Sequence, residues 1–210
     1  MSSTAHTEAF EKLRTEVLNR VMPGLRHKML GKLQPVTLLS QVLSRKLSLG
    51  SADNAYVQTQ VDEIKLNARL LTVAMQNLFT WVALDAPVQL PAEDLLDECV
   101  DLLKMECYTN HLIITNHVTS RQPLPALEAR VLLCAGIILL ADKQALEKTL
   151  EIRASDDAIQ FKWNKACTTS VSSNPGMLRN WDWITDISPA CQIEMIDSGI
   201  QFSFPVADLV

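Results

Sequence analysis

Apolar residues recur in alternating steps of four and three from residue 57 to residue 82, the spacing of a helix with one hydrophobic stripe. The stripe consists of Val57, Val61, Ile64, Ala68, Leu71, Met75, Leu78 and Val82. A looser version runs through Met29, Leu33, Val36, Ser40, Leu43 and Leu47. Gly50 supplies a turn between the two stretches, and Ser51 and Asp53 supply N-cap chemistry. Because this connection is short, the pattern predicts a long antiparallel helical hairpin.

A single hairpin cannot bury two apolar stripes by itself, so we expect a second copy to complete a four-helix bundle. The predicted assembly is a homodimer, and the alternative is a hairpin covered by the chain's own second half. An amphipathic helix is expected from Thr4 to Arg20. Pro23 and Gly24 are expected to break or kink the chain after it, and Pro35 to bend the first long helix.

The second half of the chain mixes short helices with strands of alternating polarity. The segment from Asp85 to Pro91 contains two prolines and divides a helical part, residues 1–86, from an α/β part, residues 87–210. We predict helices over 92–108 and 126–147, a strand over 111–118, and two strand hairpins over 150–163 and 191–204. A polar loop over 168–174 and the stretch 176–187 lie between the hairpins. This order predicts an α+β fold, with a helical hairpin followed by an α/β sandwich of one mixed sheet and helices on one face.

Composition narrows the class of protein. The chain has 210 residues, 48% of them hydrophobic, and a net charge of -5, which is typical of a globular protein and excludes disorder. The absence of a basic run argues against binding to nucleic acid or to an anionic membrane surface. The longest apolar run, residues 131–141, is too short to cross a bilayer. Five cysteines without a CxxC pair and the lack of a secretory signal predict a cytoplasmic, reduced protein.

The segment Leu25-Arg-His-Lys-Met-Leu-Gly-Lys-Leu-Gln34 resembles the phosphoacceptor box of sensor histidine kinases, in the pattern H-R-x-K-N-N-L-Q. His27, Leu33 and Gln34 match in register, whereas Gly31 and Lys32 stand at the two asparagines. The order of elements over residues 20–210 is similar to that of these kinases, and the end from 199 to 205 is similar to the last strand of their ATP-binding domain. The resemblance implies that His27 accepts a phosphoryl group.

The nucleotide-binding motifs of that family are missing. In the best register of E-L-x-x-N-A-x-K-H, residues 136–145, Leu140 stands where the family's asparagine holds magnesium. The D-x-G-x-G motif would fall on residues 163–167, which contain neither aspartate nor glycine, and no glycine-rich lid is present. Leucine cannot ligate magnesium or offset phosphate charge, so we expect no ATP, no other cofactor and no metal.

A phosphoacceptor hairpin joined to such a domain resembles the histidine phosphotransferases that derive from histidine kinases. The resemblance implies a phosphorelay in which His27 passes a phosphoryl group to or from a response-regulator aspartate. By its register His27 lies on the outer side of the bundle, and an exposed imidazole offers a ring nitrogen for attack on an aspartyl phosphate. By the family's docking mode, the receiver domain would contact Arg26, Lys28, Met29, Leu30 and Lys32.

The sequence also allows functions other than phosphotransfer. Lys28 stands where many kinases carry an acidic base after the histidine, which favours a catalytically inert dimeric adaptor, a pseudokinase that acts by binding. A surviving ATPase is a third hypothesis.

The remaining histidines and tryptophans do not predict a further site. His111 and His117 have no cysteine or acidic residue at ligand spacing, so a zinc site is not expected. The tryptophans at 163, 181 and 183 are more typical of a core than of a ligand cage.

Overall fold

A computed structural model describes residues 2–82, 88–142, 148–155, 158–163, 191–196 and 199–204. The chain forms two compact units, which we call the hairpin unit (residues 22–84) and the α/β unit (residues 1–21 with 85–210). The second boundary between them falls between residues 84 and 85. The first 21 residues, however, group with the α/β unit and not with the hairpin, because Leu13, Val17 and Val21 are completely buried there.

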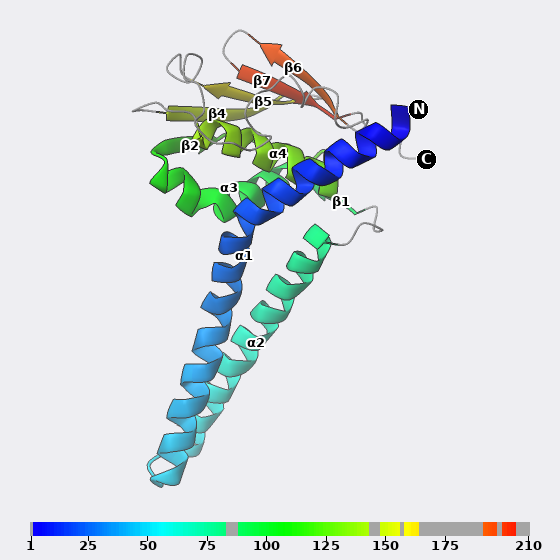
Figure 1. The fold of residues 1–210 in the computed structure, drawn as a ribbon. Helices are drawn as coiled ribbons and strands as arrows, with labels where there is room; N and C mark the ends of the chain where they lie inside the picture. The colour runs from blue at the N-terminus through cyan, green and yellow to red at the C-terminus, as the bar shows by residue number, and fades with distance from the viewer. Residues whose placement is uncertain are drawn as a thin grey trace. The chain divides into compact units, whose positions relative to one another are not determined.

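The hairpin unit contains the second part of α1 (Ser2–Ser48) and all of α2 (Asn54–Val82), which run antiparallel (Figure 1). Gly50 has a φ of 63°, a left-handed conformation that glycine adopts without strain. The Asp53 carboxylate accepts a hydrogen bond from the Tyr56 backbone N–H at 2.7 Å and so caps α2. Across the turn, the Lys46 ammonium lies 3.8 Å from the centre of the Tyr56 ring. The predicted helical hairpin is confirmed.

Helix α1 runs without interruption through Pro23 and Pro35, so the expectation that Pro23 could break the helix is wrong. Each proline removes one backbone donor, the one that would bond to the carbonyl four residues earlier. The carbonyls concerned are those of Asn19 and Gly31. The helix continues past both positions.

The α/β unit contains a mixed sheet in the order β2-β4-β5-β7-β6. Strand β2 (Leu112–Asn116) is parallel to β4 (Lys148–Ser155). Strands β5 (Ala158–Trp163), β7 (Gly199–Ser203) and β6 (Gln192–Ile196) continue it with antiparallel pairs. Along β4, Leu150 and Ile152 are buried whereas Thr149 and Arg153 are exposed, so one face of the sheet meets the core. The predicted mixed sheet and its two hairpins are confirmed.

Helices α3 (Ala92–Thr109) and α4 (Ala126–Ala141) cover one face of this sheet (Figure 1). Every residue of α4 from Ala129 to Ala141 is buried, as its continuous apolar sequence predicted. Two short strands, β1 (Gln89–Pro91) and β3 (Pro123–Pro125), pair antiparallel and were not predicted, because both are three residues long and contain proline.

Several predictions lie outside the described residues. They are the end of the fourth helix at 143–147, the strand turns at 156–157 and 197–198, the polar loop at 168–174 and the stretch at 176–187. The family's D-x-G-x-G register is described only at its first position, Trp163, which is buried. Trp181 and Trp183 are also outside the described residues.

Candidate functional site

His27 lies on α1 within the hairpin unit, and its side chain is exposed. The helical period sets this exposure, since the apolar neighbours Leu25 and Met29 are buried and half-buried respectively. His27 therefore stands on the opposite side of the helix from Leu25 and Met29. The sequence register predicted this placement.

Three cations surround His27 on the same helix. Arg26, Lys28 and Lys32 are all exposed, and Leu30 is 40% exposed between them. Over residues 22–84 the sequence has seven lysines and arginines against three acidic residues, whereas the rest of the chain has twelve against twenty-one. The hairpin unit therefore carries a net positive charge within an acidic protein, and positive charge favours contact with an anionic group.

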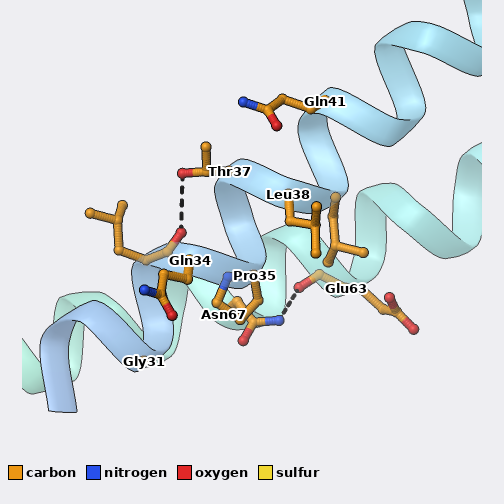
Figure 2. Close-up of a pocket in the computed structure, with 10 residues that line it drawn as sticks. Gly31, Gln34, Pro35, Thr37, Leu38, Gln41, Glu63 and Asn67 are labelled. Carbon is orange, nitrogen blue, oxygen red and sulfur yellow. Dashed lines mark hydrogen bonds between the residues drawn. The ribbon is translucent and has the colours of Figure 1, made fainter. Parts of the chain in front are cut away.

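A hollow of about 900 Å³ lies between α1 and α2, beginning one helical turn beyond His27 at Gly31. Figure 2 shows Pro35 and Leu38 from α1 in this hollow, with Glu63 and Asn67 contributed by α2. The remaining lining residues are Leu33, Gln34, Thr37, Leu39 and Gln41. The hollow holds one carboxylate, several neutral amides and an apolar floor, and this chemistry suits a protein surface better than a highly charged small molecule.

The hairpin unit also carries most of the exposed apolar surface of the described residues. Thirteen of the sixteen large hydrophobic side chains with high exposure lie between residues 22 and 82. They are Met22, Leu30, Leu33, Leu38, Val42, Leu47, Leu49, Leu66, Leu70, Val73, Met75, Phe79 and Val82. Within the described range 22–82, only Leu25 and Trp81 are buried. An apolar surface of this extent is typical of a helical pair that associates with further helices.

In the α/β unit, the residues in the register of the family's nucleotide-binding motif are closely packed. Leu140, at the position of the family's magnesium-binding asparagine, is 1% exposed. At Gly136 on the same helix, a Cβ would lie 2.8 Å from Phe161 Cε2 and 3.2 Å from Phe202 Cζ. Helix α4 therefore packs directly against the aromatic side chains of the sheet. Within the described ranges, no group of three His, Cys, Asp or Glu side chains could hold a metal ion.

Charged groups on α4 and β4 are used for internal packing. The Arg130 side chain is 3% exposed and pairs with Glu98 of α3 at 2.9 Å. The Lys148 ammonium is buried at the start of β4 and donates a hydrogen bond to the Ala141 carbonyl at 2.6 Å. This bond satisfies a carbonyl at the C-terminus of α4, where a cation is favourable. Both groups hold the unit together.

Sequence reasoning missed the role of Arg20. Its guanidinium pairs with Glu106 in the last turn of α3 and with Asp142, the C-cap of α4, at 2.7 Å. Carboxylates at the C-terminal ends of helices are unfavourable, and neither helix has a basic residue in its last turn. Arg20 supplies the missing cation to both ends and so holds the first part of α1 on the α/β unit. No local sequence signal links residue 20 to residues 106 and 142.

The described cysteines are free and buried, with Cys167 outside the described residues. Burial raises the pKa of the Cys107 thiol to about 11 and that of Cys191 to about 12. Burial also raises the pKa of Cys134, which has Cys99 as a hydrogen-bonding neighbour. Such thiols remain protonated at neutral pH and are poor nucleophiles. Cys107, Cys134 and Cys191 are therefore not candidates for a nucleophilic site.

The other described histidines lie apart from this site. His117 Nε2 is 3.3 Å from Glu151, which also pairs with Arg153 on the exposed side of the sheet. The pKa of Glu151 is lowered, chiefly by the hydrogen bond from Arg153 and further by the charges of Arg153, His117 and Lys162. His111 has a φ of 54° in the turn between α3 and β2. These contacts are typical of surface ion pairs and turns.

No family model matches the chain, and no curated protein matches it. Solved structures of histidine kinases do match. The cytoplasmic segment of histidine kinase QseC is 11% identical with a TM-score of 0.43, and the match covers 67% of this chain and 95% of that one. A histidine kinase from Burkholderia phymatum is 12% identical with a TM-score of 0.42, over 92% of this chain and 98% of that one. Histidine kinase ThkA, solved with response regulator TrrA, is 13% identical with a TM-score of 0.35, over 95% and 65%. No helix in the described part of the chain is long and apolar enough to span a membrane.

Proposed function

We propose that this chain is a histidine phosphotransferase of a two-component phosphorelay, which carries a phosphoryl group on His27 and binds no ATP. The observation that supports this most is an exposed imidazole, flanked by Arg26 and Lys28, on a helical hairpin whose sequence resembles a phosphoacceptor box. The α/β unit that follows has the expected sandwich architecture but closes its nucleotide register with apolar packing. We place this activity in the cytoplasm, where receiver domains act.

The proposed step is a transfer between a receiver aspartate and His27. A ring nitrogen attacks the phosphorus of the aspartyl phosphate, a P–N bond forms, and the P–O bond to the carboxylate breaks. The aspartate leaves with the bonding electron pair, and the imidazole loses its other proton to solvent. The reverse reaction phosphorylates the receiver. Such a transfer depends mainly on positioning and on charge compensation, and the receiver supplies its own divalent cation.

The packing of α4 supports the proposal that the chain binds no ATP. A nucleotide needs a polar cradle and a magnesium ligand, and Leu140 offers neither. Because Leu140 and Ala141 are 1% and 2% exposed, this part of α4 has no polar surface toward which a triphosphate could point. Calorimetry with Mg-ATP at millimolar concentration should show no binding heat. A saturable heat would support the ATPase hypothesis instead.

A homodimer would bury the exposed apolar stripes of the hairpin unit. In the described range 22–82 only Leu25 and Trp81 are buried, and thirteen large hydrophobic side chains are exposed. A second copy of the chain carries the same exposed apolar surface, and twofold dimers are the commonest symmetric assembly. We therefore propose a four-helix bundle with one His27 on each outer flank. Sedimentation analysis should give a dimer, and Leu70→Glu together with Val73→Glu should weaken it.

The receiver domain would approach His27 over the basic part of α1. Arg26, Lys28 and Lys32 would face the acidic pocket of the receiver, and Met29 and Leu30 would supply apolar contact. Charge complementarity of this kind mainly raises the association rate. Transfer should therefore slow as ionic strength increases.

The decisive experiment incubates the chain with a phosphorylated receiver domain and follows the label. We expect an acid-labile, base-stable label on the wild-type chain and none on His27→Ala. His117→Ala is the matched control, because it removes another exposed histidine. A label that persists in His27→Ala would exclude His27 as the acceptor.

The second candidate is a catalytically inert adaptor that regulates a signalling protein by binding to it. Lys28 favours this reading, since a cation stands where many kinases have a base beside the histidine. The adaptor predicts that the chain binds the receiver without becoming labelled. The same incubation therefore distinguishes the two functions.

A further inference from the structure

Gly31 is a glycine for which the fold gives no reason. It lies in the middle of α1 on the exposed side, where glycine is unfavourable relative to alanine. A Cβ at Gly31 would meet no atom within 4 Å, whereas one at Gly136 would clash with Phe161. Its φ is not positive, in contrast with that of Gly50. Neither close packing nor backbone conformation requires glycine at this position.

Gly31 lies one helical turn after His27, where a larger side chain would cover one side of the imidazole. Residues four apart on a helix are neighbours, with Cβ atoms about 5–6 Å apart. Helical side chains also lean toward the N-terminus, so a side chain at residue 31 would extend over the turn that carries His27. Glycine leaves that side of the imidazole uncovered.

The other helical neighbours of His27 follow the same pattern. Residues three and four before it are Gly24 and Pro23, and Leu30 follows three residues after it. Three of the four positions that could shield the ring therefore carry no flexible side chain. The hollow that begins at Gly31 extends this open side along the hairpin (Figure 2). Pro35 also lines this hollow.

We propose that Gly31 is a positioning residue which keeps the C-terminal side of the His27 ring clear for a macromolecular phosphodonor. The rim of the receiver's active site would occupy the space above Gly31 while the aspartyl phosphate reaches the ring. This inference rests on the proposed function. It concerns approach by a protein, so a small phosphodonor should not require the same clearance.

The test compares Gly31→Leu with the wild-type chain, using two donors. One donor is phosphoramidate, and the other is a phosphorylated receiver domain chosen because it labels the wild-type chain. We expect Gly31→Leu to lose at least tenfold in transfer rate from the receiver and to stay within twofold with phosphoramidate. Gly31→Ala should lie between Gly31→Leu and the wild type. Ser44→Leu, an equal enlargement at an exposed position farther along α1, should leave both rates unchanged.

Folding does not obscure the result, because leucine favours helix more than glycine does and should raise the unfolding midpoint. Transfer from the receiver within twofold of wild type in Gly31→Leu would overturn the inference and leave the proposed function intact. An equal loss with both donors would also overturn it, because the effect would then lie in the reactivity of the ring. A wild-type chain that neither donor labels on His27 would overturn the inference together with the proposed function.

Discussion

Replacement of Gly136 by alanine tests how closely α4 packs on the sheet. The new Cβ would lie 2.8 Å from Phe161 Cε2 and 3.2 Å from Phe202 Cζ. Both rings are completely buried, and they pack edge to face with their centroids 5.0 Å apart. Neither ring can turn away from α4 without losing its contact with the other, so the helix itself must move.

The size of the effect follows from two opposing contributions. Overpacking a buried site costs about 1–3 kcal/mol, and the rigid ring pair places this site in the upper half of the range. Alanine recovers about 1 kcal/mol of helix propensity. We therefore expect Gly136→Ala to lower the free energy of unfolding by about 1–2 kcal/mol. Gly31→Ala, which creates no contact within 4 Å, should raise it by up to about 1 kcal/mol.

The two variants form a matched pair of opposite sign. Urea unfolding followed by far-UV circular dichroism and tryptophan fluorescence gives the free energy for each. If Gly136→Ala proved as stable as Gly31→Ala, the close contact between α4 and the two phenylalanine rings would be refuted. The nucleotide register would then have more room than the packing of α4 implies.

Three other perturbations test the α/β unit. Arg20→Met should cost about 2 kcal/mol by leaving two carboxylates at helix ends, and should speed proteolysis within residues 7–21; an unchanged cleavage rate would contradict this. Arg130→Ala should cost about 3–5 kcal/mol because it removes the buried guanidinium that pairs with Glu98, whereas a paired apolar replacement of both should be nearly neutral. Since the folded-state pKa values of Cys107 and Cys191 are raised, the unfolded state loses these protons first, and the free energy of unfolding should fall from pH 9 to pH 11. Alanine at both cysteines should flatten that slope.

Local patterns predicted most of the elements. The alternation in residues 150–163 and the apolar run in residues 131–141 depend on periods within one segment, and both gave the observed strands and buried helix. The exposure of His27 followed from the helical register in the same way. The sequence patterns did not predict contacts between residues far apart in the chain. The stripe of Leu13, Val17 and Val21 reads as one side of a helix, but nothing in it specifies that it packs on the α/β unit.

The candidate site divides along the same line. The resemblance around His27 and the leucine at position 140 can both be read from the sequence. The closure of that region by Phe161 and Phe202 depends on residues more than twenty positions away and needed the structure. In the sequence Gly31 is only a mismatch to the family pattern. The structure shows that a Cβ at this position would meet no atom within 4 Å.

The division of the chain makes the hairpin an insertion within the α/β unit, which it leaves after residue 21 and rejoins at residue 85. An unstructured loop of about 60 residues at this place would cost about 4 kcal/mol in loop-closure entropy when the two flanking segments pack together. The folded hairpin brings residues 22 and 82 to the same end of its antiparallel helices, and so it lowers that cost. The hairpin unit therefore also favours the packing of residues 1–21 in the α/β unit. Mutations that unfold the hairpin unit should weaken that packing although they lie outside residues 1–21.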